Sequence, residues 1–401
     1  MRFLVIAALS CQQYLAVSLI YAAVPVVLRQ AGAPLELVGL FGLVFFAFTV
    51  NFLWAPLVDR YRLTALGRRR SWILAMQLGA ALTLLGTALL KPERDQIAIL
   101  AVSLLLATLA ATQRIATLGY VSEVLRPDER SLGAALVGWG GALGNVLGGA
   151  ACLYLIEAYG WTPAIAAFGL LMALLAGTVF AIAEPAASAA GDTKTAGALL
   201  EAFTRRDIWS AVVVIAPATF GIAIAFAMVQ PRLVDLGFGL TEIGTAVAAA
   251  NLLAFTLVGP LAGVLARRAL PLRAIVLGGL LLAPGFLLLV PAGGRLGPEA
   301  AALVSLAFVF CALAVQTIAF NTFFFSLARP GEAATDVTFL TAMMSAIALA
   351  GFAASGFLVG ALGYEATFLV AGAGYLATAG LAGLRLRSAA WPGAAVGKAG
   401  P

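Results

Sequence analysis

The chain alternates long apolar stretches with short segments that hold most of its charge. Twelve stretches approach or exceed the roughly 20 residues that a helix needs to cross a bilayer. They are 3–28, 36–58, 72–90, 97–120, 132–156, 163–183, 208–230, 242–266, 271–291, 299–328, 337–361 and 365–385. Backbone polar groups in lipid must pair within their own segment, so the pattern predicts an all-α integral membrane protein with twelve transmembrane helices.

Composition supports a lipid environment for most of the surface. Of the 401 residues, 63% are hydrophobic and 10% are charged, and the mean hydropathy is +1.04. A soluble domain carries roughly 25% charged residues. The chain has no histidine, which removes the commonest general base and metal ligand. Its three cysteines lie in apolar stretches without CxxC spacing. We therefore expect no enzyme, no catalytic residue, no metal site and no cofactor.

The positive charges predict an orientation. With the N-terminus placed inside, most of the 24 Lys and Arg fall in cytoplasmic segments, and few fall in the outer loops. This bias follows the positive-inside rule and predicts that both termini are cytoplasmic. We expect the protein in a bacterial cytoplasmic membrane, and the net charge of +6 does not indicate a nucleic-acid partner.

The two halves of the chain repeat each other at an offset of 203 residues. Gly148 matches Gly351, and Gly160 before an aromatic residue matches Gly363 before another. A parallel repeat of six-helix halves is similar to the major facilitator transporters, which bind substrate near the midplane. The prediction is an N-terminal half 1–183, a cytoplasmic linker 184–207, a C-terminal half 208–385 and a cytoplasmic tail 386–401.

Arg114 is the one ionisable side chain that the pattern places well inside a span, whereas all 18 acidic residues fall in loops or end turns. A central arginine costs about 2.5–3.5 kcal/mol on insertion scales. We therefore expect Arg114 either to face a cavity and meet an anion, or to reach the inner interface.

Further polar residues within the spans are candidates for substrate binding. Each alone is also explained by a hydrogen bond between helices. As a set over both halves they predict a moderately polar cavity. The candidates are Gln13, Tyr14, Tyr21, Asn51, Gln113, Asn145, Gln230, Asn251, Gln316 and Asn321, together with Arg114.

Charged residues of two cytoplasmic loops are candidates for a gate. The loop between spans two and three is rich in arginine, and the next cytoplasmic loop holds acids with which it can pair. Such pairs would latch the inner side, although a purely topological role explains the arginines equally well. The candidates are Asp59, Arg60, Arg68, Arg69, Glu123 and Glu129.

One motif resembles a particular branch of these transporters. The segment 51–61, NFLWAPLVDRY, followed by 67–72, GRRRSW, is similar to the peptide/acetyl-CoA transporter family, which includes the AmpG and RhtX/FptX groups. Supporting matches are QRIAT at 113–117, RPDER at 126–130, PRLVDLG at 231–237 and TDVT at 335–338. The family pattern places acids at positions 114 and 118, where this chain has Arg114 and Leu118, and a lysine at Asn51.

The resemblance implies a secondary transporter with no enzymatic activity. Twelve spans and a short tail look more like the siderophore permeases, which implies import of a ferric siderophore or a similar amphiphilic anion. The alternatives are a muropeptide permease and an exporter of drugs or amphiphiles. The partners implied are a small solute, the lipid bilayer and a co-transported ion, and we expect a monomer.

Overall fold

A computed structural model describes residues 2–124, 140–181, 203–258, 261–262, 271–327 and 333–387. Within these ranges every regular element is a helix. In the first half they are α1 Arg2–Ser18, η1 Leu19–Ala23, α2 Val24–Gln30, α3 Leu35–Leu40, η2 Phe41–Leu43, α4 Val44–Val50, η3 Asn51–Leu53, α5 Ala55–Arg60, α6 Arg68–Thr87, α7 Gln96–Val124, η5 Leu147–Ala151, α9 Cys152–Tyr159, α10 Trp161–Ala176 and η6 Gly177–Ala181.

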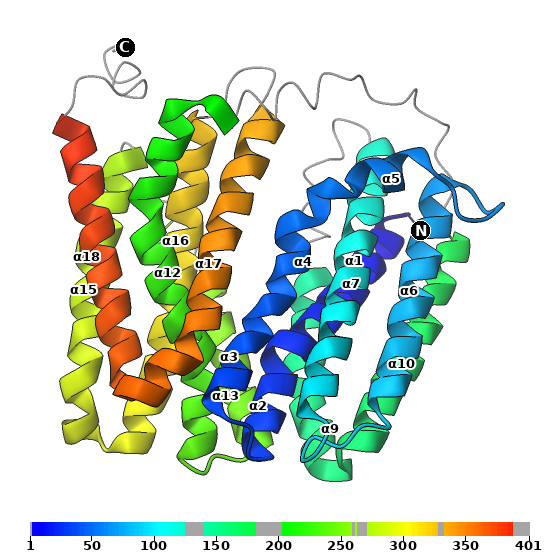
Figure 1. Cartoon of the computed structure of the whole chain (residues 1–401), viewed down its shortest axis with the longest axis horizontal. Coiled ribbons are helices and arrows are strands. Elements are labelled where there is room, and N and C mark those ends of the chain that lie inside the picture. The colour runs from blue at the N-terminus through cyan, green and yellow to red at the C-terminus, as the bar shows by residue number, and fades with distance from the viewer. Residues whose placement is uncertain are drawn as a thin grey trace. The chain divides into compact units, whose positions relative to one another are not determined.

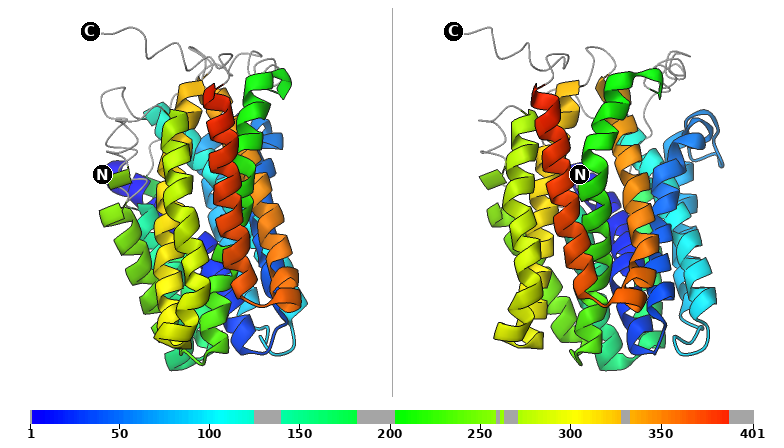
Figure 2. Two further views of the ribbon diagram at one scale, coloured as in Figure 1. Left: turned by 90° about the vertical axis from the view of Figure 1, so that its left-hand side faces the viewer. Right: turned by 60° about the vertical axis from the view of Figure 1, so that its left-hand side comes forward.

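The second half contains several longer helices. They are α12 Arg206–Asp235, α13 Leu240–Leu253, η7 Ala254–Val258, α15 Pro271–Leu296, α16 Pro298–Leu327, α17 Ala333–Leu362 and α18 Glu365–Arg387. Figure 1 shows α12, α17 and α18 running side by side, and Figure 2 shows the same packing from two other directions. The end of the predicted linker is helical, because α12 begins at Arg206.

Ten of the predicted stretches contain described helices that are long and apolar enough to cross a membrane. The other two are helical as well. Span two is broken into α3, η2, α4, η3 and α5, and its apolar helical part runs over Leu35–Val50. Span three is α6, which begins with the three arginines at 68–70. In the described helices each acidic residue lies in an end turn, as expected.

Two compact units divide the chain. Unit 1 is Met1–Pro34, Phe41–Gly191 and Phe238–Thr245, and unit 2 is Leu35–Leu40, Asp192–Gly237 and Ala246–Pro401. Each unit therefore includes one short segment from the other half of the sequence. Within unit 1, α6 packs on α7 and α10; within unit 2, α12 packs on α17 and α18.

The repeat seen in the sequence recurs in the local geometry. Gly160 and Gly363 both have left-handed backbone, with φ of 87° and 79°, and each N–H bonds a carbonyl four residues back at 2.8 Å. Only glycine adopts this conformation readily, which explains why it stands at both turns. A Cβ at Gly148 would lie 2.2 Å from the carbonyl oxygen of Leu15, and one at Gly351 would lie 2.7 Å from that of Phe220. The fifth helix of each half thus touches the first helix of its own half.

The glycines of span five form a continuous contact with α1. A Cβ added at Gly140, Gly144 or Gly148 would lie 2.2–2.3 Å from a backbone oxygen of α1. Such spacing lets two helix backbones approach closely. The glycine pattern at every fourth position therefore serves helix packing.

Candidate functional site

Arg114 is exposed on the side of α7 that is otherwise buried. The exposed stripe of α7 runs through Ile97, Ala101, Leu105 and Thr108, and at 100° per residue Arg114 projects about 140° away from its centre. Ala107, Ala110 and Ala111, one to two turns earlier on the side of Arg114, are all at most 1% exposed. In the described part of the chain its guanidinium makes no hydrogen bond or ion pair. Arg114 therefore offers a charged donor group where a helix normally buries apolar side chains.

Two polar side chains beside Arg114 are buried, and each has an atom without a hydrogen-bond partner in the described part of the chain. Gln113 is 1% exposed and Thr117 is 2% exposed. The Gln113 Nε2 and the Thr117 Oγ1 have no hydrogen-bond partner among the residues that the structure describes. Orphaned buried donors of this kind cost free energy and are rare in native proteins. Together with Arg114 they place three hydrogen-bond donors within five residues of α7.

A glutamine network crosses the interior of unit 1 near the same helix. The Gln12 Nε2 donates to the carbonyl oxygen of Met172 at 3.0 Å, and the Gln77 Nε2 donates to the Gln12 Oε1. Both glutamines are fully buried. The Trp54 Nε1 donates to the Thr112 Oγ1 at 3.1 Å, which links span two to α7. Two separate polar contacts thus lie inside the spans of unit 1: one joins α1, α6 and α10, and the other joins span two to α7.

Three further candidates of the first half lie at helix contacts. Tyr14 packs on the span-five glycines, because a Cβ at Gly141 would lie 3.0 Å from its ring. The Ser18 hydroxyl donates to the Asn145 carbonyl at 3.0 Å, where η1 and η5 depart from regular α-helix. The Tyr21 ring lies 5.6 Å from Phe45.

The predicted binding residues differ in how far their side chains are exposed. Gln13, Gln113, Gln230 and Gln316 are buried, at 1–5% exposed. Tyr14, Tyr21, Asn51, Asn145, Asn251 and Asn321 are half-buried, and Arg114 is exposed. In unit 2 the Tyr375 hydroxyl donates to the Gln316 Oε1 at 2.6 Å, while the Gln230 Oε1 has no partner within the described ranges. Arg114 therefore differs from the rest of the set.

The predicted gate is only partly described. Arg69 is 5% exposed, Arg68 is half-buried, and both have interaction partners. The side chains of Asp59, Arg60 and Glu123 and the whole of Glu129 lie outside the described residues. The gating role of these loops stays a prediction.

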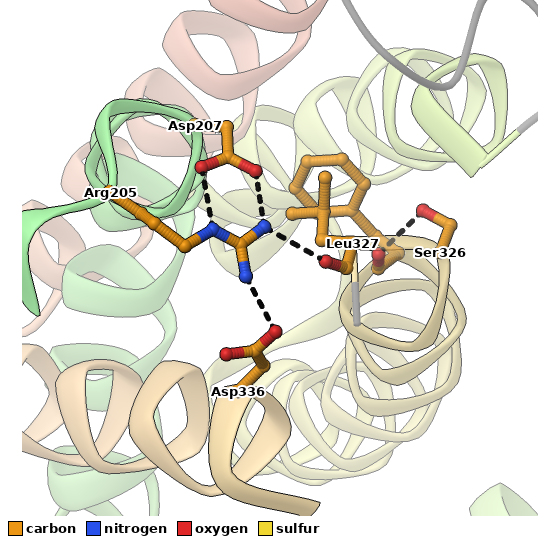
Figure 3. Close-up of polar contacts among 6 residues, drawn as sticks. Arg205, Asp207, Ser326, Leu327 and Asp336 are labelled. Carbon is orange, nitrogen blue, oxygen red and sulfur yellow. Dashed lines mark hydrogen bonds and ion pairs between the residues drawn. The ribbon is translucent and has the colours of Figure 1, made fainter. Parts of the chain in front are cut away.

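Sequence reasoning missed an ion-pair cluster at one end of unit 2 (Figure 3). The Arg205 guanidinium binds both carboxylate oxygens of Asp207, at 3.0 and 2.5 Å, and its NH1 bonds the Asp336 Oδ2 at 2.5 Å. Its NH2 also donates to the Leu327 carbonyl at 3.2 Å. The Asp207 hydrogen bond is the main cause that raises the pKa of Arg205 above its usual value.

This cluster ties three helices together. Asp336 is fully buried in the first turn of α17, Leu327 ends α16, and Arg205 caps α12. The Phe203, Trp209 and Phe339 rings meet beside it, with centroids 5.4–6.1 Å apart. Arg205 was assigned to the linker, and no spacing rule connects it to an acid 131 residues away.

Comparisons with known proteins agree with this architecture. The profile of the Major Facilitator Superfamily matches residues 6–348, so the chain belongs to the major facilitator superfamily of transporters. The structure of a bacterial homologue of the human lysosomal transporter Spinster, inward-facing and unoccupied, aligns at a TM-score of 0.71 and 16% identity, covering 95% of this chain and 94% of that one. The nucleoside transporter NupG aligns at 0.72 and 14%, covering 96% and 100%.

Proteins related in sequence indicate which group of the superfamily this chain resembles. The anhydromuropeptide permease of Escherichia coli K12 is 31% identical over 257 residues, covering 62% of this chain and 52% of that protein. The putative transporter AmpG 3 of Rickettsia prowazekii is 24% identical, covering 66% and 67%. The chain spans about half the length of the anhydromuropeptide permease that it matches. These relatives support the AmpG group of the family and not the expected siderophore permeases.

Proposed function

We propose that this protein is a secondary transporter that works by alternating access and imports an anionic solute of the anhydromuropeptide class. The observation that carries the proposal is Arg114, an exposed guanidinium on a buried helix face without a protein partner in the described residues. The sequence analysis ranked a ferric siderophore first. The relatives named for anhydromuropeptide permeation favour the alternative that it kept open.

The chemistry of the substrate fits a cationic donor within a span. A muropeptide joins a sugar to a peptide that carries free carboxylates. A guanidinium binds a carboxylate through two parallel hydrogen bonds, which are about twice as strong as neutral ones. Retaining Arg114 in a span costs about 2.5–3.5 kcal/mol on insertion scales, which an anionic ligand offsets.

Uptake of a labelled anhydromuropeptide into right-side-out membrane vesicles tests the proposal. We expect vesicles with the wild-type protein to accumulate the label, and Arg114→Gln to reduce uptake about tenfold or more, as for a lost charged hydrogen bond. The matched control is Arg94→Gln, which removes an exposed arginine from the loop before α7. Equal uptake by the Arg114 and Arg94 variants would refute the role of Arg114.

The same vesicles separate the competing substrates and directions. Accumulation of ferric siderophore in place of anhydromuropeptide would reverse the substrate assignment while leaving the transporter class intact. Accumulation in inverted vesicles alone would show export. We place both termini in the cytoplasm, as the distribution of arginine and lysine predicts, and the monomer and the co-transported ion stay part of the proposal.

A further inference from the structure

Two close helix contacts each involve a glutamate facing a glycine. In unit 1, α9 meets the start of α13: a Cβ at Gly239 would lie 2.9 Å from the Glu157 Oε1. In unit 2, α3 meets α17: a Cβ at Gly360 would lie 2.9 Å from the Glu36 Oε1. We call these the α9–α13 seam and the α3–α17 seam.

The two seams are copies of each other under the internal repeat. Glu36 and Gly239 are 203 residues apart, and so are Glu157 and Gly360. This is the register that relates Gly160 to Gly363. In each seam one position is glutamate and the other is glycine, and both glutamates come from the first half of the chain. Each seam therefore contains one carboxylate, which lies opposite a glycine at the symmetry-related position.

The carboxylate of Glu157 binds the N-terminus of α13. Its Oε2 accepts the backbone N–H of Thr241 at 2.5 Å, and the Glu242 Oε2 accepts the N–H of Gly239 at 2.9 Å. The first N–H groups of a helix have no partner within the helix and carry the positive end of its dipole. Glu157, from a different helix, supplies both the acceptor and the negative charge.

The α9–α13 seam is packed less tightly than the contact between span five and α1. Beside this seam, Gly244 of α13 faces Ala150 of η5, which leads directly into α9, and a Cβ at Gly244 would lie 3.1 Å from the Ala150 Cα. By contrast, a Cβ on the glycines of span five would lie 2.2–2.3 Å from carbonyl oxygens of α1 over three successive turns. In the α9–α13 seam small residues face each other, and the exposed Glu157 carboxylate binds Thr241. Such a surface parts and re-forms without repacking large side chains.

We propose that Glu157 is a latch that holds the start of α13 on α9 in this conformation, and that its release is a step of the transport cycle. The proposal rests on the proposed function in one respect, because the step belongs to alternating access. Glu157 acts through α13 and is a positioning residue. Glu36 of α3 is its counterpart in the α3–α17 seam.

A reversible cross-link across the α9–α13 seam tests whether it parts. In a background with Cys11, Cys152 and Cys311 replaced by alanine, the pair Ala150→Cys and Gly244→Cys would bring two Cβ atoms to about 3.5 Å, which suits a disulfide. We expect oxidation to reduce anhydromuropeptide uptake more than tenfold and reduction to restore it. The control pair is Ala22→Cys and Gly149→Cys, with Cβ atoms at about 4.0 Å inside unit 1, which should cross-link without loss of uptake.

A second measurement needs no substrate. The rate of cross-linking of the α9–α13 pair, followed by the loss of free thiols to a maleimide reagent, reports how often the seam is closed. We expect Glu157→Ala to slow this rate about threefold, as for a lost charge–dipole contact at a helix end. Glu299→Ala, which removes another exposed glutamate from the first turn of a helix, should not change it.

The outcomes separate the latch from the substrate. Full uptake by the cross-linked protein, or equal cross-linking rates in the Glu157→Ala and Glu299→Ala variants, would overturn the latch. Failure of the wild type to take up anhydromuropeptide would overturn the proposed substrate, while the cross-linking rates would still decide the latch.

Discussion

Replacing Arg205 should be among the most destabilising single changes in unit 2. Arg205→Met keeps the length of the side chain but removes the positive charge beside Asp336, whose side chain is fully buried. Removing one partner of a buried ion pair costs about 3–5 kcal/mol, because the remaining charge stays in a poorly solvating site. Asp207 is 25% exposed, so Asp207→Asn should cost only about 1 kcal/mol.

Thermal unfolding of the purified protein in detergent measures the difference. At roughly 2 °C for each kcal/mol, Arg205→Met should lower the unfolding midpoint by about 6–10 °C and Asp207→Asn by about 2 °C. The double variant Arg205→Met, Asp336→Leu should recover much of the loss, because apolar replacement of both partners removes the buried charge. A loss in the double variant equal to the sum of its two single variants would refute the buried pair as the cause.

Two further changes test the packing and the polar interior. Gly144→Leu should greatly reduce the amount of folded protein recovered by size-exclusion chromatography, because a Cβ there would lie 2.3 Å from the Cys11 carbonyl oxygen. Gly86→Leu is the control and should not reduce recovery, because a Cβ at Gly86 would have no atom within 4 Å. Equal recovery of the two variants would refute the contact. Tyr375→Phe removes the 2.6 Å bond to Gln316 and leaves a buried acceptor, so the unfolding midpoint should fall by the equivalent of about 1–3 kcal/mol. An unchanged midpoint would count against that bond.

The presence of the helices could be predicted because a lipid environment allows few other backbone structures. A stretch of about 20 apolar residues has to be a helix in a bilayer, whatever its neighbours are. The internal repeat could be recognised in the sequence because both halves need glycine at the same positions. Gly160 and Gly363 have positive φ, and Gly148 and Gly351 lie where two helix backbones touch. Both requirements depend on the backbone alone, so the glycines recur at a fixed offset in the sequence.

The side-chain pairs could not be predicted in the same way. Gln12 bonds Gln77, and Arg205 bonds Asp336, because particular faces of distant helices meet. The length and the charge of an apolar span do not predict which face of the helix contacts which neighbouring helix. Arg114 was found because a lone charge in a span is rare, but its exposure follows from the arrangement of the helices around α7.

The charge inventory constrains how an anionic substrate could be driven inward. Each net negative charge moved inward against an inside-negative potential of 100 mV costs about 2.3 kcal/mol. Import therefore has to carry a cation with the anion or draw on a gradient of the anion itself. The acids of the described helices lie in end turns, as Glu36, Glu157 and Asp336 do, so none stands in the middle of a span to hold a cation alone. A co-transported cation would then bind beside the carboxylates of the substrate, and Arg114 would compete with that cation for the same negative charge.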